Sequence, residues 1–230
     1  MFKTLFFSLI FGLQYFLTFG QDTLRTYHAE DTLKVKEVVI LVNGKANGPV
    51  KRYDLDRRLV VIGSLKNDQR HGIFYDLDPE TGDTLRQVTF QNNQRQGEAL
   101  SFYPNGTLRE RSNFQLNQLE GEVLSYYEDG TLSEKTPFKA NKPEGTSIRY
   151  YPNGSIESKT GYLAGQFHGI REEYNASGTL QYQANYERGV LNGKEESFFP
   201  DGSLRSNINS TSWMCCDQQF WFARHFTTNN

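Results

Sequence analysis

A glycine recurs every 24 residues through the second half of this 230-residue chain. The series is Gly97, Gly121, Gly145, Gly169 and Gly193. Nine residues after each comes a second glycine, and in four of the five copies Asn or Asp stands directly before it. Asn-Gly and Asp-Gly pairs favour tight turns, because a positive φ costs least at Gly, Asn and Asp. A fixed period of this length indicates a repeat architecture.

Each repeat predicts a pair of antiparallel strands. In the copy that starts at Gly121, Leu124 and Tyr126 alternate with polar residues, and a second such run extends from Leu132 to Phe138. Period-two alternation is typical of a half-buried strand, and no stretch shows a comparable helical period. We therefore expect an all-β fold: an elongated, single-layer antiparallel sheet of stacked β-hairpin repeats of about 24 residues.

The first 20 residues predict an export signal. Lys3 is followed by an apolar run from Leu5 to Phe19. That run is short for a helix that must cross about 30 Å of hydrocarbon, so a cleaved signal peptide at residues 1–20 is favoured over a membrane anchor. Cleavage near Gly20 would deliver the protein to the periplasm, the outer cell surface or the medium.

The remaining chain divides into three parts. Residues 21–36 are polar and predict a lead-in to the first strand. Residues 37–205 hold the repeat array, with seven units plus a half strand. Residues 206–230 break the pattern and gather both tryptophans and both cysteines of the chain. Terminal units of a repeat stack are expected to be atypical, so this aromatic segment is either a cap over the last hairpin or a docking tail.

The repeat resembles the MORN repeat, in the bacterial variant that occurs in YwqK-type antitoxin-like proteins. The resemblance is clearest in Tyr-Tyr-Pro-Asn-Gly-Ser-Ile at 150–156 and Phe-Phe-Pro-Asp-Gly-Ser-Leu at 198–204, and it extends from about residue 38 to 205. It implies stacked hairpins used for protein contacts and sometimes for lipid contacts. Antitoxins act in the cytoplasm, whereas this chain begins with a predicted export signal.

The alternation also predicts which side chains share a face. One face should carry Leu100, Phe102, Leu108 and Phe114 with their equivalents, while the second ring of each aromatic pair points to the opposite face. A partly exposed apolar strip indicates an interaction surface. An alternative is that the rings are only the thin core of the sheet. The candidate interaction residues are Phe102, Tyr126, Tyr150, Tyr174, Phe198, Tyr103, Tyr127, Tyr151, Trp213 and Trp221.

The sequence offers no catalytic or cofactor-binding constellation. His71 and His168 occupy one polar turn position of the repeat, which holds other polar residues elsewhere, so we expect no metal site. A flat sheet supplies no cleft for paired carboxylates, so we expect no enzyme activity. Cys215 and Cys216 are adjacent, which strains a disulfide between them; free thiols or an intermolecular bond are favoured.

Charge narrows the class of partner. The formal net charge is −2, with 25 basic and 27 acidic residues well interspersed, which gives no long-range attraction to nucleic acid. We therefore expect a non-enzymatic exported scaffold that binds another protein. The alternatives are a module that binds lipid or glycan surfaces of the cell envelope and an antitoxin-like neutralising protein; the oligomeric state stays open.

Overall fold

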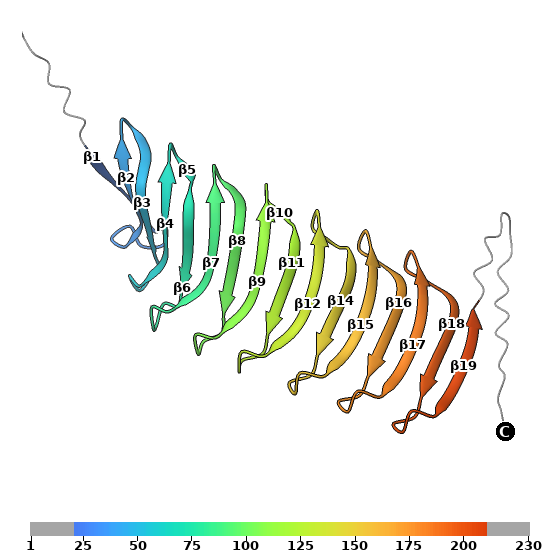
Figure 1. The fold of residues 1–230 in the computed structure, drawn as a ribbon. Helices are drawn as coiled ribbons and strands as arrows, with labels where there is room; N and C mark the ends of the chain where they lie inside the picture. The colour runs from blue at the N-terminus through green and yellow to red at the C-terminus, as the bar shows by residue number, and fades with distance from the viewer. Residues whose placement is uncertain (1–20, 211–230) are drawn as a thin grey trace, which may run out of the picture.

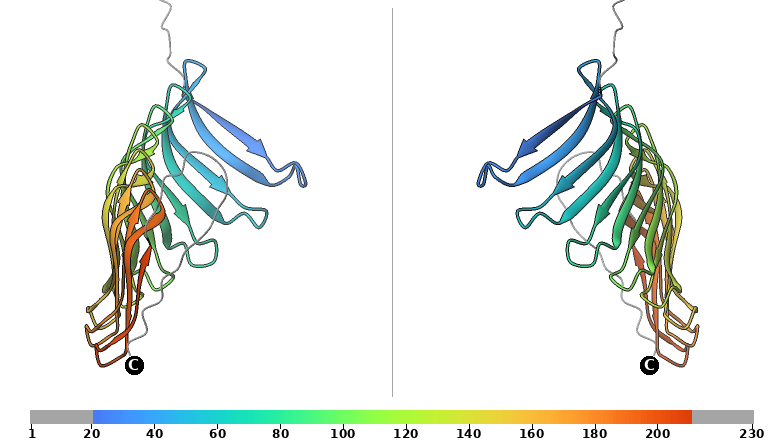
Figure 2. Two further views of the ribbon diagram at one scale, coloured as in Figure 1. Left: turned by 90° about the vertical axis from the view of Figure 1, so that its right-hand side faces the viewer. Right: turned by 90° about the vertical axis from the view of Figure 1, so that its left-hand side faces the viewer.

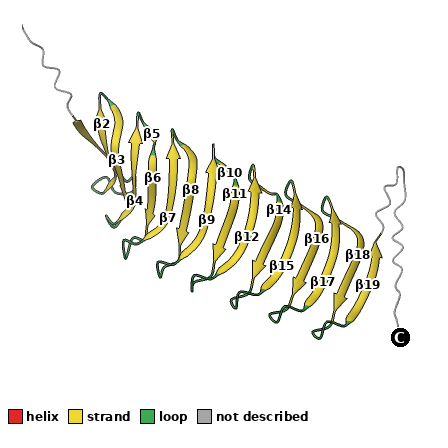
Figure 3. Cartoon of the chain, viewed as in Figure 1, coloured by secondary structure: helices red, strands yellow, loops and turns green. Residues whose placement is uncertain are grey.

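The computed structural model describes residues 21–210, and within that range the chain forms one open antiparallel sheet without helices (Figures 1 and 3). Successive strands lie side by side from one end of an elongated ribbon to the other (Figure 1). The predicted all-β, single-layer sheet of stacked hairpins is confirmed.

Nineteen strands build the sheet. They are β1 (Gln21–Tyr27), β2 (Val35–Val42), β3 (Lys45–Tyr53), β4 (Leu59–Lys66), β5 (Gln69–Arg70), β6 (Gly72–Leu77), β7 (Thr84–Gln91), β8 (Gln94–Phe102), β9 (Leu108–Gln115), β10 (Gln118–Leu119), β11 (Gly121–Tyr126), β12 (Leu132–Lys139), β13 (Lys142–Pro143), β14 (Gly145–Tyr150), β15 (Ile156–Leu163), β16 (Gln166–Tyr174), β17 (Leu180–Glu187), β18 (Val190–Phe198) and β19 (Leu204–Ser210). The two-residue strands β5, β10 and β13 each lead into the strand that follows. Seven hairpins therefore succeed β2, from β3–β4 to β18–β19.

The Asn-Gly and Asp-Gly signals form the longer turns, which all lie along the lower edge in Figure 1. In the turn at 103–107, the Gly106 N–H donates to the Tyr103 carbonyl at 2.9 Å and Asn105 Oδ1 accepts from the Thr107 N–H at 2.9 Å. Gly106 has φ +82, a conformation that side chains with a Cβ rarely adopt. The same turn recurs in six of the seven hairpins, whereas the turn of β6–β7 is one residue longer. In the hairpin β3–β4, Arg57 takes the glycine position with φ +64.

Two-residue turns connect the hairpins along the opposite edge. Both residues of such a turn have positive φ, as in Leu116 (+51) and Asn117 (+68), which is the geometry of a type I′ turn. From the second such turn on, each turn is bonded to the strand that leaves the turn before it. Asn117 Oδ1 accepts from the Arg95 N–H at 2.7 Å, and the Asn117 N–H donates to the Arg95 carbonyl at 3.0 Å. A ladder of such bonds ties neighbouring hairpins together.

Two predicted boundaries need correction. The lead-in at residues 21–36 contains a strand, because β1 pairs antiparallel with β2 from Gln21 opposite Val42 to Tyr27 opposite Val35. Its residues are polar since β1 is an edge strand, exposed along its whole length. At the other end, β19 continues to Ser210, so the regular array does not stop at residue 205.

A β-bulge in every hairpin decides which side chains share a face. Phe102 pairs with Leu108, but Ser101 pairs with Glu110, so Arg109 has no direct partner. Beyond the bulge the alternation is reversed, and Phe114 lies opposite Gly97. The prediction that Phe114 shares a face with Phe102 is therefore wrong, because the extra residue moves every later side chain of the second strand to the other face.

The two faces differ in packing. One, which we call the packed face, carries a row with one residue per strand in its middle, including Val50, Phe74, Val88, Ala99 and Ser112. These side chains are buried, and Val50 is 1% exposed. Phe90 and Phe114 of a neighbouring row pack against them, so side chains of one layer cover one another.

The core row changes character along the sheet. Towards the N-terminus it is apolar, whereas Ser112, Thr136 and Ser147 occupy it in the middle. Thr136 Oγ1 and Ser147 Oγ lie 2.6 Å apart, so the buried hydroxyls satisfy each other. The sheet also twists, and the first strands fan away from the later ones in the end-on views of Figure 2.

Candidate interaction surface

The other face carries a continuous apolar row beside the longer turns. We call it the strip, and this side of the sheet the strip face. Each hairpin contributes one directly opposed pair to the strip. The central pairs are Phe102–Leu108, Tyr126–Leu132, Tyr150–Ile156, Tyr174–Leu180 and Phe198–Leu204. The register thus aligns the first ring of the four aromatic pairs with Tyr174, which has no aromatic neighbour in the sequence, and these five rings are half-buried.

A second row on the strip face alternates aliphatic and cationic side chains. Leu100, Leu124 and Ile148 stand on the first strands of their hairpins, and Arg111 and Lys135 stand between them. The cations are neutralised from the adjacent strand. Arg111 Nε lies 2.6 Å from Glu98 and Lys135 Nζ lies 2.6 Å from Glu122. This part of the face is amphipathic but carries no excess of positive charge.

The strip becomes more polar in the later hairpins. Tyr174 Oη donates to Glu172 at 2.7 Å, and Lys159 Nζ lies 5.6 Å from the centre of the Tyr174 ring. Loss of water around the phenol, together with the bond to Glu172, raises the pKa of Tyr174 to about 12. The phenol therefore stays protonated as a donor at neutral pH.

In three of the four aromatic pairs, the second ring forms a hydrogen bond to the next hairpin. The hydroxyls of Tyr103, Tyr127 and Tyr151 donate to the carbonyl oxygens of Tyr126, Tyr150 and Tyr174 at 2.7, 2.6 and 2.8 Å. Burial raises the pKa of Tyr127, in keeping with a protonated donor. These three predicted residues thus link repeats. Phe199, at the same position, has no hydroxyl and is 46% exposed.

The polar turn position before each repeat glycine also links repeats. Glu120 Oε1 accepts from the Ala140 N–H at 2.9 Å, and Glu144 Oε2 accepts from the Ala164 N–H at 2.6 Å. His71 stands at this position with Nδ1 buried and unpaired. Within residues 21–210, no group of three His, Cys, Asp or Glu side chains is arranged to hold a metal ion.

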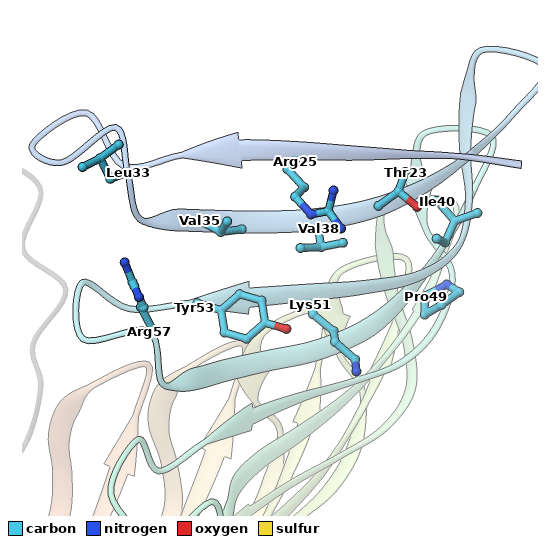
Figure 4. A pocket seen from close by; sticks show the side chains of 10 residues that line it. All are labelled: Thr23, Arg25, Leu33, Val35, Val38, Ile40, Pro49, Lys51, Tyr53 and Arg57. Carbon is cyan, nitrogen blue, oxygen red and sulfur yellow. The ribbon is translucent and has the colours of Figure 1, made fainter.

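A hollow of 780 Å³ opens on the strip face at the N-terminal end of the sheet (Figure 4). Its walls come from β1, β2 and β3 and from the loops that follow β1 and β3. The lining residues are Thr23, Arg25, Leu33, Val35, Val38, Ile40, Pro49, Lys51, Tyr53 and Arg57. Thr23 and Arg25 belong to the segment that the sequence predicts as a polar lead-in, so the repeat pattern does not reveal this hollow. The apolar run at 38–42, which supplies Val38 and Ile40 to the hollow, is the part of the site that the sequence does show.

The predicted residues of the C-terminal segment are not placed. Trp213, Trp221, Cys215 and Cys216 lie outside the described residues. The predicted signal peptide at residues 1–20 also lies outside them.

With the geometry in place, comparison with known families identifies the repeat. Four segments match the family model described as MORN repeat variant: residues 95–116, 119–140, 143–163 and 167–188. This repeat type is non-catalytic and generally mediates protein or membrane interaction. The hairpins β3–β4, β6–β7 and β18–β19 lie outside the matched segments but carry the same bulge beside the longer turn.

A search of the curated proteins returned no match. Among the described residues, no helix is long and apolar enough to cross a membrane.

Proposed function

We propose that this chain is an exported, non-enzymatic scaffold that binds another protein along the strip. The observation that carries the proposal is the alignment of Phe102, Tyr126, Tyr150, Tyr174 and Phe198 with aliphatic partners on one half-buried line. Each two-stranded hairpin adds roughly 10 Å to the sheet, so five hairpins give a strip on the order of 45 Å long. That length suits an extended segment or a helix of a partner protein.

The charge pattern favours a protein over an anionic membrane. Basic residues draw a protein to anionic lipid only where they are not already neutralised. On the strip face, Arg111, Lys135 and Lys159 each have a carboxylate from a neighbouring strand within 2.6 to 3.7 Å. The rings then supply affinity and the charge pairs supply register, as at other protein interfaces with aromatic anchors.

The test compares two double variants, each of which replaces two partly exposed apolar side chains by alanine. Tyr126→Ala/Tyr150→Ala removes two rings of the strip. Leu116→Ala/Leu163→Ala removes exposed leucines at the two-residue turns, far from the strip, where Leu116 is 62% and Leu163 42% exposed. Tagged protein is used to capture partners from envelope extract, and the captured protein is then purified and titrated. Circular dichroism first establishes that both variants are folded.

We expect the strip variant to lose the partner and the turn variant to keep it. Truncating two aromatic anchors should weaken binding by about 100-fold, because each costs on the order of 1 to 2 kcal/mol. Equal capture by parent and strip variant would show that the rings only stabilise the sheet. Sedimentation of the protein with vesicles but with no protein partner would favour the lipid-surface alternative instead.

A further inference from the structure

The hollow at the N-terminal end differs from the rest of the strip face in its charge. Three of its ten lining residues are cationic, and none is acidic. Arg25 and Lys51 both flank Val38, because Arg25 pairs with Val38 across β1 and β2 and Val38 pairs with Lys51 across β2 and β3. Arg57 lies at the end of the hollow, in the loop after β3 (Figure 4).

These cations lack the carboxylate partners that the other cations of this face have. Among residues 21–210, neither Arg25, Lys51 nor Arg57 forms an ion pair, in contrast to Arg111 and Lys135. Two acids near Arg57 in the sequence bind another cation. In the loop after β3, Asp54 and Asp56 both bind Arg58 at 2.8 Å. Like charges gathered on neighbouring strands are unfavourable, and an anion from outside the chain would remove that cost.

Arg57 also occupies a backbone conformation that disfavours it. The equivalent turn position is glycine in the later hairpins, for example Gly106 at φ +82, whereas Arg57 has φ +64. A long side chain with a Cβ is uncommon in this region and costs stability. Unfavourable backbone conformations of this kind concentrate at functional sites. The chain thus retains a cation at the rim of the hollow where glycine would be less strained.

The floor of the hollow is apolar and its rim is held in place. Val35, Val38, Ile40 and Pro49 line it between the cations. At the rim Leu33 is 81% exposed, so its side chain is free to contact a ligand in the hollow. The loop that carries Leu33 is tied to β3, because His28 Nε2 lies 3.0 Å from the Tyr53 carbonyl oxygen.

We propose that the hollow binds one free anionic amphiphile. Its oxyanion head, a carboxylate or phosphate, would contact Arg25, Lys51 and Arg57, and its aliphatic chain would lie on Val38 and Ile40. A volume of 780 Å³ is that of a typical small-molecule site, and apolar walls with a few polar groups are the usual composition of such sites. This site does not depend on the protein-binding proposal, because it lies on β1 to β3, outside the five hairpins whose rings carry that proposal.

The binding test uses probes that differ in head or chain only. Dodecanoate below its micelle concentration, dodecyltrimethylammonium and acetate are titrated into the purified protein by calorimetry. A fourth arm sediments the protein with vesicles of phosphatidylcholine and phosphatidylglycerol. We expect 1:1 binding of dodecanoate, at least tenfold weaker binding of the cationic probe and of acetate, and no enrichment with vesicles. Equal binding of both dodecyl probes, absence of dodecanoate binding or enrichment with vesicles instead would overturn the proposal.

Variants then locate the site. Arg25→Gln/Lys51→Gln should weaken dodecanoate binding by about tenfold or more per cation, since each removes a charge-assisted contact. Arg111→Gln/Lys135→Gln, which removes two paired cations of the same face, should leave it unchanged. Arg57→Gly should weaken binding while the thermal midpoint stays equal or rises, a combination that misfolding cannot produce. Equal losses in the first two variants would place the ligand elsewhere.

Discussion

The ladder between the two-residue turns is incomplete at its last two links, and this gives a sharp test of what joins the repeats. In a complete link, Asn141 Oδ1 accepts from the Leu119 N–H at 2.8 Å while the Asn141 N–H donates to the Leu119 carbonyl at 3.1 Å. Glycine replaces the asparagine at the next two turns. Gly165 and Gly189 keep only the backbone bond, at 2.9 and 2.8 Å.

Gly189→Asn should complete the final link. The N–H that would donate belongs to Phe167, whose carbonyl already accepts from Gly189. A Cβ at position 189 would meet only the Gln166 Cβ at 3.9 Å, and Asn117 and Asn141 adopt similar positive φ. One net hydrogen bond contributes about 1 kcal/mol, which corresponds to roughly a fivefold change in the local opening constant. We therefore expect the last hairpins to gain about that much stability.

Gly165→Asn is the matched control. A Cβ there also fits, with the Lys142 Cβ at 3.6 Å. The residue that would have to donate is Pro143, which has no N–H. The substitution therefore adds the same side chain at the same turn position without a bond, and we expect no gain.

Native-state hydrogen exchange measures the effect locally. The Phe167 amide should exchange about fivefold more slowly in Gly189→Asn, and the urea midpoint should not fall. If Gly165→Asn stabilises the protein as much as Gly189→Asn does, the gain comes from the loss of glycine freedom in the unfolded chain and the ladder argument fails.

Three further predictions follow from the packing and the turns. Gly63→Ala should lower the free energy of unfolding by about 1 to 3 kcal/mol in urea titrations, because its Cβ would lie 2.4 Å from the Phe74 ring; an unchanged midpoint would show that the ring moves freely. Tyr127→Phe should cost about 1 kcal/mol by removing the hydroxyl bond to the next hairpin, and a stabilised variant would contradict this role. Asp129 accepts from the Thr131 hydroxyl and N–H, which lowers the pKa of its carboxyl; its stabilisation is present above the unfolded pKa of about 3.9 and is lost as the pH falls through the folded value. The urea midpoint of unfolding should therefore fall less between pH 5 and pH 3 in Asp129→Asn than in the parent protein.

The sheet could be predicted from the sequence because the turn and strand patterns that specify it are local and recur in every repeat. Asn-Gly and Asp-Gly pairs specify turns, and period-two alternation specifies strands, so several copies in register indicate stacked hairpins without any long-range information. The sequence assigned Phe114 to the wrong face of the sheet, because a single bulged residue reverses the alternation. Nothing in the residue type of Arg109 shows that it is bulged, yet the bulge transfers Phe114 to the packed face.

The candidate site was only half predictable for a similar reason. The five strip rings precede the bulge, so simple alternation placed Phe102 and its equivalents correctly on one line. The roles of Tyr103 and Tyr127 as links between hairpins depend on hydroxyl geometry that the sequence does not encode. The hollow depends on β1, whose polar residues conceal an edge strand.

Departures from the repeat pattern therefore indicate where to look for function in this molecule. On the strip face of the later hairpins, Arg111, Lys135 and Lys159 have carboxylate partners, and glycine occupies the turn position of Gly106. A cation without a carboxylate on the next strand, or an arginine where the turn favours glycine, receives no benefit from the sheet itself. Arg25, Lys51 and Arg57 all depart in this way, and they surround the same hollow. Their arrangement around one hollow with an apolar floor, and not the lack of an ion pair alone, favours a ligand over chance variation among the repeats.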